Sequence, residues 1–410
     1  MPLIPTALGI RPRLAVELRP EGVVAARADD AQAIVSAVAH ATFAEGVLQP
    51  GLKSGNVVGR TAVIAAVRKA LEAVALKERQ TTVVLPDAAV RVLLLDFDAL
   101  PAKVGEALPI IKFRLKKLLP FDSDEAVVSY QIMSSVRGMV RVLAVAVPKD
   151  VLAEYESVVR EAGFEPGAVL PSTLAACAGM GEMEAAALLV NAGDTVVTTA
   201  IVQGGVLLLH RTVDLQAEGL HERAEAAAHT AALESAGLPP EIFAHPDALP
   251  LVDVESSAGE WAMQEPLTGY GVIDDERLQS AERSETHSRH LADLITAEAL
   301  AEAATHADPV AALELELEVH RLTAVEREVT QAVSVAAAYF EDTLQFAPGV
   351  VLAAGTMGAE TLGALLHAAG FADGEIKVRE MVEPGMLTGG AVSARVPHGW
   401  MAGVRGALRS

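Results

Sequence analysis

A repeated pattern of strands constrains the fold of this chain more than any other feature. Residues 14–27 read as two short β runs around a Pro-Glu-Gly turn at 20–22. Residues 186–213 read as a second hairpin, and the Gly pair at 204–205 is a strong signal for a two-residue turn. Each hairpin leads on to helices. This repetition predicts a duplicated α/β architecture and not a ladder of evenly spaced βαβ units.

A separate α/β module is expected between the two hairpins. From Thr81 the chain alternates between short Val- and Leu-rich runs, a helix that Pro120 stops, and an amphipathic helix at 149–164. Upstream, the apolar spacing at 29–48 and at 59–79 predicts two helices. The predicted domains are the first part of lobe I at 1–81, a small inserted α/β subdomain at 82–150, the remainder of lobe I at 151–185, and lobe II at 186–410.

The second half of the chain carries a long insertion and a long helix. Residues 239–285 lose periodicity and gain prolines and acidic residues, so an acidic, partly mobile insertion is predicted at about 239–317. An apolar stripe at spacings of three and four then predicts a helix, which Pro348 ends. A strand at 350–355, a helix and a C-terminal helix follow. The stripe consists of Leu322, Val325, Val329, Val333, Ala336, Phe340 and Leu344.

The composition favours a large core and a reducing compartment. Hydrophobic residues make up 51% of the chain but aromatic residues only 4%, so the core must be built from Ala, Val and Leu. No uninterrupted apolar run reaches about 18 residues, so no membrane-spanning helix is expected, and the first residues are a poor signal peptide. Cys177, the single cysteine, lies among small apolar residues, which predicts a buried structural thiol. We therefore expect a cytoplasmic location.

The charge of the chain argues against nucleic-acid binding. Asp and Glu number 54 against 32 Lys and Arg, for a formal charge of −22, whereas phosphate neutralisation needs a surplus of basic residues. The strongest local exception is the segment KFRLKK at 112–117. Two interpretations of it stay open: a solvated helix face, or a contact to an acidic partner or to anionic lipid. The scattered histidines form no metal-binding motif, so no metal site is predicted.

The order of several segments resembles the PilM family of type IV pilus assembly proteins. A helix ending in Leu-Leu-Pro-Phe at 118–121 is followed by the strand DEAVVSYQI at 124–132, as in the inserted subdomain of that family. The similarity continues through 142–173, through the second hairpin, and through the long helix with the segment VVLAAGTMG. Together these segments cover most of residues 14–235 and 318–410. The chain is thus identified as a divergent member of this family.

The resemblance implies an α/β fold of the actin-like ATPase type, with duplicated ribonuclease H-like lobes and an inserted small subdomain as in FtsA. It also implies a cytoplasmic protein that is peripheral at the inner membrane through its partners. Those partners would be the cytoplasmic tail of a PilN-like membrane protein and, beyond it, the pilus motor or other assembly-platform proteins. The tail would bind in a groove beside the inserted subdomain. The residues expected near this groove are Leu93, Leu95, Phe97, Phe113 and Phe121.

The cofactors that the resemblance implies are ATP and Mg²⁺, but the three loops that would hold them depart from the family pattern. In the first loop Arg19 replaces a Gly, and the Pro and Glu after it remove an amide donor and repel phosphate. In the second loop Asn191 stands where an Asp is expected and cannot supply the charge that helps to hold Mg²⁺. The third loop keeps a single Gly. The degenerate site would consist of Glu17, Arg19, Asn191, Gly193, Thr195 and Gly355.

These departures predict a scaffold of the type IV pilus inner-membrane complex that is not an enzyme and that binds ATP weakly if it binds it. Two alternatives remain. The chain is an active actin-like ATPase if the six loop residues converge on Mg-ATP. It is a cytoplasmic component of a type II secretion system if it belongs to the secretion proteins that share this fold.

Overall fold

The computed structural model describes residues 12–29, 34–136, 138–180, 183, 185–215, 309–371, 376–387 and 396–409. Contacts divide the chain into two units, one of residues 1–217 with 328–410 and one of residues 218–327. Nearly all the described elements belong to the first unit. Most of the predicted acidic insertion, through residue 308, lies outside the described residues, and residues 309–317 begin the helix α7.

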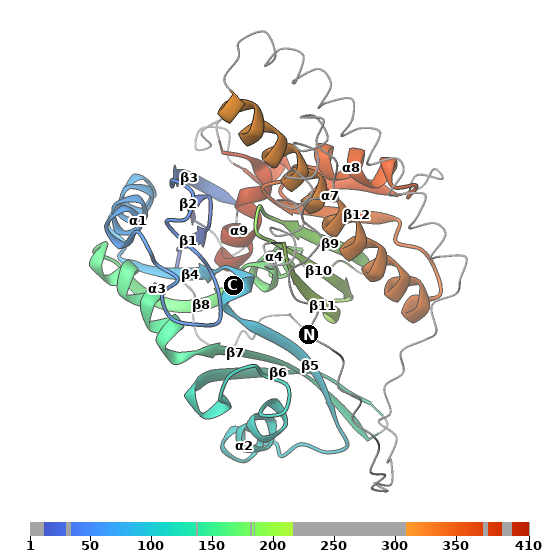
Figure 1. Ribbon diagram of the computed structural model, residues 1–410. Helices are drawn as coiled ribbons and strands as arrows, with labels where there is room; N and C mark the ends of the chain where they lie inside the picture. The colour runs from blue at the N-terminus through green and yellow to red at the C-terminus, as the bar shows by residue number, and fades with distance from the viewer. Residues whose placement is uncertain are drawn as a thin grey trace, which may run out of the picture. The chain divides into compact units, whose positions relative to one another are not determined.

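The first unit is built on two five-stranded sheets with the same topology (Figure 1). In each sheet three strands pair antiparallel as a meander. A fourth strand then pairs in parallel with the first strand of the meander, and a fifth pairs in parallel with the fourth. We call the part around the first sheet lobe I and the part around the second lobe II. The sheet of lobe I has the order β3 (Val35–Thr42), β2 (Gly22–Ala28), β1 (Leu14–Arg19), β4 (Gln80–Leu85), β8 (Glu165–Pro171). The sheet of lobe II has the order β11 (Val206–Asp214), β10 (Val196–Gln203), β9 (Ala187–Ala192), β12 (Val350–Gly355), β13 (Lys377–Glu380).

The turns of the two hairpins follow from their glycines. Gly204 and Gly205 both have positive φ angles, as a tight turn between twisted strands requires. At Gly22 a Cβ atom would lie 2.4 Å from the carbonyl oxygen of Ala41 on β3, so only Gly lets β2 and β3 approach there.

Both faces of the lobe I sheet are buried. One face, with Leu14, Val16 and Leu18, packs under α1 (Arg60–Val74) and α3 (Lys149–Glu161). The other face contributes Ala15 to a core that also includes the inner face of the lobe II sheet. The helices α4 (Ser172–Gly179) and α9 (Ala402–Leu408) lie in this second core, next to the one-turn helix at His398–Met401. Strands covered on both faces explain the nearly continuous apolar runs of the sequence.

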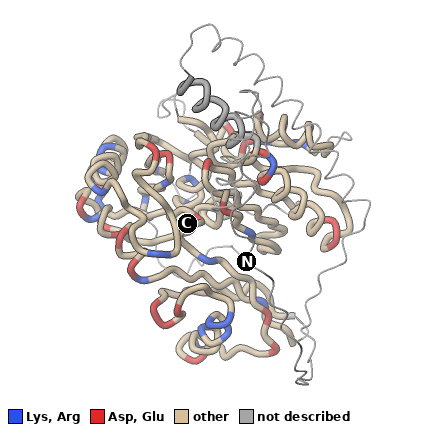
Figure 2. The backbone as a smooth tube through the Cα atoms, in the orientation of Figure 1, with Lys and Arg blue, Asp and Glu red and all other residues tan. Residues whose placement is uncertain are grey.

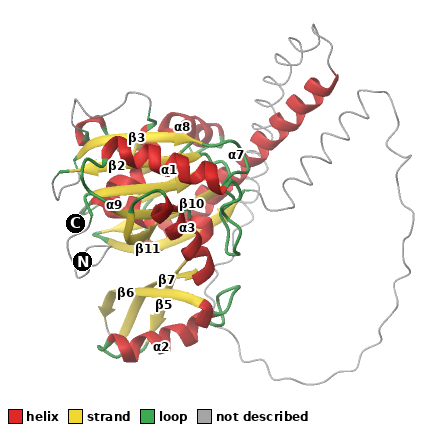
Figure 3. Cartoon of the chain, turned by 90° about the vertical axis from the view of Figure 1, so that its left-hand side faces the viewer, coloured by secondary structure: helices red, strands yellow, loops and turns green. Residues whose placement is uncertain are grey.

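A three-stranded antiparallel sheet forms a small subdomain between β4 and β8. Its order is β5 (Arg91–Phe97), β7 (Met139–Pro148), β6 (Ala126–Val136). Helix α2 (Val104–Leu115) covers one face of it, as Figure 3 shows. Ile111 and Leu115 of α2 are fully buried against Leu95, Val142 and Ala144. The one-turn helices at Asp87–Ala89 and Ser123–Glu125 lead into the two outer strands.

The remaining described elements belong to the second half of the chain. They are α7 (Pro309–Leu344), α8 (Gly358–Ala368) and a one-turn helix at Pro384–Met386. The apolar stripe predicted for α7 is buried at Val329, Val333, Ala336 and Phe340, whereas Leu322 of the same stripe is exposed. Among the described residues, none of the helices is both long enough and apolar enough to cross a membrane.

One predicted element is wrong. Residues 29–48 do not form a helix, because their described part contains the strand β3, which pairs with β2 from Gly22 opposite Thr42 to Ala28 opposite Val35. The sequence of β3, VSAVAHAT, is rich in Ala and has helix-like apolar spacing. Pairing with a neighbouring strand overrides this local preference.

Candidate functional site

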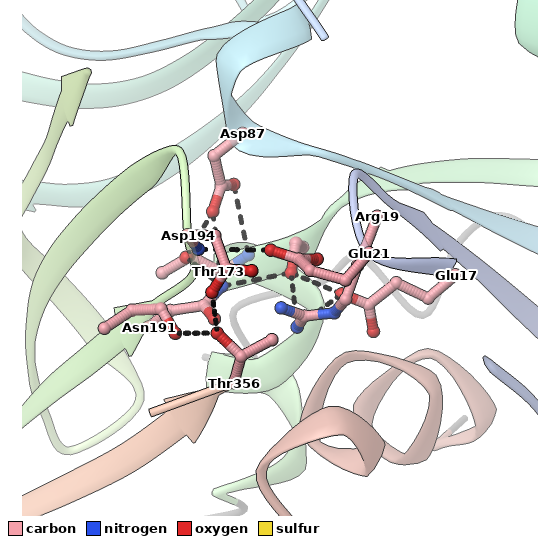
Figure 4. Close-up of polar contacts among 10 residues, drawn as sticks. Glu17, Arg19, Glu21, Asp87, Thr173, Asn191, Asp194 and Thr356 are labelled. Atoms are coloured by element: carbon pink, nitrogen blue, oxygen red, sulfur yellow. Dashed lines mark hydrogen bonds and ion pairs between the residues drawn. The ribbon is translucent and has the colours of Figure 1, made fainter. Parts of the chain in front are cut away.

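The two lobes bring polar side chains together where their parallel strands end. In lobe I, Glu17 lies near the end of β1, Asp87 follows β4, and Ser172 follows β8. In lobe II, Asn191 lies at the end of β9 and Thr356 follows β12. The carboxyl ends of parallel strands in open α/β sheets are the usual place for ligand sites. Figure 4 shows Glu17, Asp87, Asn191 and Thr356 meeting at this place.

Asn191 is the centre of the network that joins the lobes. Its amide nitrogen Nδ2 donates to the Oγ of Ser172 at 3.0 Å and to the Oγ1 of Thr173 at 2.9 Å, and lies 3.4 Å from the Oδ2 of Asp87. Asp87 in turn accepts the backbone N–H of Thr173 at 3.1 Å and its hydroxyl at 2.5 Å. All four side chains are buried. Asn191 is thus held as a donor toward lobe I.

A buried ion pair lies beside this network. The guanidinium of Arg19 lies 2.7 Å from the Oε1 of Glu17, and the Ser172 hydroxyl donates to the same oxygen at 2.6 Å. Burial raises the pKa of Glu17 above its ordinary value of 4.5, and this effect outweighs Arg19 and Ser172, which both lower it. The Oε2 of Glu17 faces Gly403 of α9, where a Cβ atom would lie only 2.3 Å away. The Glu17 carboxylate, which would face a metal in this family, therefore contacts Arg19, Ser172 and the backbone of α9.

A second bridge joins the turns of the two hairpins. The carboxylate of Glu21, in the β1–β2 turn, accepts the backbone N–H of Asp194 at 3.1 Å. The side chain of Asp194 accepts the hydroxyl of Thr356 at 3.1 Å. In this arrangement a carboxylate occupies the position in front of the second loop where a phosphate would receive backbone N–H groups.

The pocket that remains between the loops is small, about 40 Å³. That volume holds a few water molecules, whereas small-molecule sites usually measure about 300–1,000 Å³. Within the described residues, four buried polar atoms at its edge have no hydrogen-bond partner, namely Glu17 Oε2, Arg19 Nε, Glu21 Oε2 and Asn191 Oδ1. Three of these atoms are acceptors, so water, which can donate to them, suits the pocket chemically.

The residues present do not fit Mg-ATP in this conformation. Glu17 is buried and paired with Arg19, Asn191 carries no charge, and the carboxylate of Glu21 accepts the Asp194 amide of the second loop. The third loop is also occupied: Gly355, with a φ of +92°, packs against the backbone of Ala192 and of Gly399. In the described part of the chain, no cluster of His, Cys, Asp and Glu could hold a metal ion.

The structure gathers most of the residues predicted for the nucleotide loops. Glu17, Arg19, Asn191, Gly193 and Thr195 all line the small pocket. Gly355 lies beside it, one residue before Thr356. Asp87, Ser172 and Thr173 complete the network and are not among the residues predicted from the sequence. They directly follow the predicted strand at 81–86 and the short strand at 166–171, but β8 joins the sheet through β4 and does not lie beside β1, so no local pattern in the sequence marks them.

The five residues predicted near a partner groove do not form one exposed surface. Leu95 is buried in the core of the small subdomain, and Leu93 and Phe97 pack against that core. Phe121 is half-buried, and only Phe113 is largely exposed. Two larger hollows exist in the described structure. One of about 460 Å³ lies between the loop at 49–56 and Arg91 at the start of β5, and one of about 520 Å³ runs along α2 beside Phe113.

Cys177 lies on α4 and is buried, as predicted. Burial raises the pKa of its thiol well above the ordinary range, which keeps it protonated at neutral pH.

The comparisons with known proteins identify the fold. No family model matches the sequence, and no curated protein matches it. A chain of the PilM–PilN type IV pilus biogenesis complex has a similar structure, with a TM-score of 0.59 and 15% identity over 97% of this chain and 98% of that one. Weaker similarity is found to the ethanolamine utilization protein EutJ from Carboxydothermus hydrogenoformans, with a TM-score of 0.39 and 12% identity over 98% of this chain and 92% of that one. The predicted fold class is confirmed: this is an α/β chain with the actin-like ATPase fold.

Proposed function

We propose that this chain is a scaffold of a type IV pilus assembly complex that binds the cytoplasmic tail of a PilN-like inner-membrane protein without needing nucleotide. The observation that carries this proposal is the structural similarity to a chain of the PilM–PilN complex, which extends over 97% of the present chain. Because the similarity includes both lobes and the small subdomain, it supports a function like that of the similar chain for the whole molecule and not for one lobe alone. The chain would then act at the cytoplasmic face of the inner membrane through its partner.

The polar network between the lobes supports independence from nucleotide. In an ATP-dependent scaffold, the phosphates and Mg²⁺ would connect the two phosphate loops. Here the Glu21 carboxylate contacts the second loop directly, and Asn191 contacts Ser172 and Thr173 across the lobes. The chain therefore supplies from its own side chains the connections that a nucleotide would otherwise make.

The hollow beside Arg91 is the best place for the tail. Its loop is held in shape by Asn56, whose side chain accepts from the backbone of Gly51 and from the hydroxyl of the buried Tyr155. Arg91 begins β5, which is an edge strand of the small sheet, so an extended peptide can pair with its backbone. The hollow of about 460 Å³ beside it can take side chains of that peptide.

Fluorescence anisotropy tests the proposal directly. A labelled peptide with the N-terminal sequence of the PilN-like protein encoded beside this chain is titrated with the purified protein, with and without Mg-ATP. We expect saturable micromolar binding that Mg-ATP does not change. The variant Arg91→Glu should weaken binding at least tenfold, because it reverses a charge at the hollow.

The matched control is Lys69→Glu, which makes the same charge reversal on the exposed face of α1. It should leave the affinity for the peptide unchanged. Binding that requires Mg-ATP would contradict the nucleotide-independent part of the proposal. No binding in either condition would contradict the assignment of the partner.

A further inference from the structure

The outer face of α2 carries apolar side chains that the fold does not use. The inner face of this helix is complete, since Ala107, Ile111 and Leu115 are buried. On the remaining surface Phe113 is 71% exposed and Val104 is 64% exposed. Ile110 and Leu118, the latter in the turn after α2, are also exposed. Large apolar side chains gathered on one helix of a water-facing surface indicate a contact with something outside the chain.

Basic residues surround these apolar side chains. Between residues 103 and 118 there are five basic residues and one acidic residue, in a chain whose formal charge is −22. Figure 2 shows the Lys and Arg positions on α2 in blue. Lys103 and Lys116 have acidic neighbours, Glu106 at 3.4 Å and Asp124 at 4.0 Å. The other three, Lys112, Arg114 and Lys117, form no ion pair within the described structure. Their charges are available to an anionic partner.

A hollow of about 520 Å³ runs along the same face. Its lining includes apolar side chains, among them Leu108 and Phe113, and the ammonium groups of Lys112 and Lys116. The one carboxylate in this lining, Asp124, is the acidic neighbour of Lys116. We define the α2 surface as this hollow together with Lys103, Ile110, Arg114, Lys117 and Leu118.

We propose that the α2 surface binds a bilayer that contains anionic phospholipids. Apolar side chains flanked by Lys and Arg are the composition of interfacial membrane contacts, in which the former enter the headgroup boundary and the latter meet lipid phosphates. The surface fits lipid better than an extended peptide. The helix pairs its own backbone and offers lysine ammonium groups, which bind phosphate as point charges, whereas an extended peptide that binds by strand addition needs a free strand edge.

This proposal goes beyond the binding of a membrane protein's tail, because it predicts attachment to lipid alone. The purified full-length chain is floated with vesicles of phosphatidylcholine, either pure or with about a third of phosphatidylglycerol. We expect binding only to the anionic vesicles, and at least tenfold weaker binding at about 0.5 M NaCl than at about 0.1 M, since salt screens the contact.

Two variants and two controls locate the contact. Phe113→Ser removes the most exposed apolar side chain, and Lys116→Glu with Lys117→Glu reverses two charges; each should reduce vesicle binding at least tenfold. The charge control is Lys69→Glu with Lys77→Glu, and the apolar control is Val58→Ser, which is exposed on another part of lobe I. Both controls should bind vesicles as the wild type does, and all variants should keep the wild-type Tm.

Three results would overturn the proposal. They are no flotation with anionic vesicles, equal flotation with pure phosphatidylcholine, and loss of binding in the controls to the same degree as in the variants. A fourth result would also overturn it. The chain would not float with vesicles but would bind a synthetic peptide of alternating Glu and Phe, and Phe113→Ser would abolish that binding. The α2 surface would then bind an acidic peptide and not a bilayer. The PilN-like peptide assay is unaffected by all of these results, so the two proposals fail separately.

Discussion

Among the contacts in the small pocket, the buried Glu17–Arg19 ion pair is the one whose loss should reduce the stability of the fold most. Removing one partner of a buried pair leaves the other charge uncompensated, which costs about 3–5 kcal/mol. Arg19→Met should therefore lower the free energy of unfolding by about 3 kcal/mol, as measured by urea denaturation. The control is Arg60→Met, which breaks the exposed pair of Arg60 with Glu161 and should cost about 1 kcal/mol or less. Equal losses in both variants would show that burial of the Glu17 pair carries no special cost.

The raised pKa of Glu17 predicts how stability depends on pH. A carboxyl group whose pKa is higher in the folded state than in the unfolded state binds its proton more tightly when folded. Its contribution is fully present below the unfolded value of 4.5 and is lost as the pH rises through the folded pKa.

The measurement is the unfolding free energy of the wild type minus that of Glu17→Gln, from about pH 4 to about pH 7. This difference should fall as the pH rises, because the Gln side chain does not titrate. A difference that stays flat would mean that Arg19 cancels the effect of burial.

At the scale of residues, the sequence predicts a site only where a local pattern marks it. Glu17, Asn191 and Gly193 could be selected because they stand at the ends or turns of recognisable hairpin strands. Asp87 and Ser172 could not, because their role depends on the pairing of β4 with β1 and of β8 with β4 in the sheet. The carboxylate of Glu21 was expected to repel phosphate; its bond to the amide of Asp194 depends on the approach of two turns 173 residues apart.

At the scale of elements, the predicted strands and helices hold where a periodic run is long or ends at a clear turn. Helix α1 and the strands around the Gly204–Gly205 turn are confirmed. Strand β3 is the exception, since the strand signal of its Ala-rich sequence is weak and its pairing with β2 decides its conformation. The contact of α4 with α9 likewise depends on small residues that are not recognisable as a packing motif in isolation.

That helix contact predicts a large effect of one methyl group. A Cβ atom at Gly406 of α9 would lie 1.7 Å from the carbonyl oxygen of Ala175 on α4, so the two helices would have to separate. Gly406→Ala should destabilise the fold by about 3 kcal/mol, the upper end of typical overpacking costs. Urea denaturation measures the loss.

Gly105→Ala on α2 is the matched control for this substitution. Nothing lies within 4 Å of its added Cβ atom, and Ala is the better helix former, so this variant should be more stable than the wild type by about 0.5 kcal/mol. If Gly406→Ala were also at least as stable as the wild type, α4 and α9 would not approach each other as closely as described.

At the scale of the whole molecule, the duplicated topology places two hairpin turns face to face, and the chain connects them with its own side chains. This arrangement predicts the response of thermal unfolding to nucleotide. A ligand that binds only the folded state adds RT ln(1 + [L]/Kd) to the unfolding free energy, or about 2.7 kcal/mol at a concentration of 100 Kd. With a pocket of about 40 Å³ and the Asp194 amide already bonded, we expect Mg-ATP at about 1 mM to leave the Tm unchanged in differential scanning calorimetry.

The variant Glu21→Ala tests whether the Glu21 carboxylate stabilises the contact between the two hairpin turns. Losing the bond to the Asp194 amide should cost about 1 kcal/mol and lower the Tm without nucleotide. The control Glu72→Ala, on the exposed face of α1, should leave the Tm unchanged. A Tm that rises by several degrees when Mg-ATP is added to the wild type would mean that the loops open and accept the phosphates, and the scaffold would then depend on nucleotide. An unchanged wild type together with a destabilised Glu21→Ala would mean that the carboxylate itself holds the lobes together in the place of a ligand.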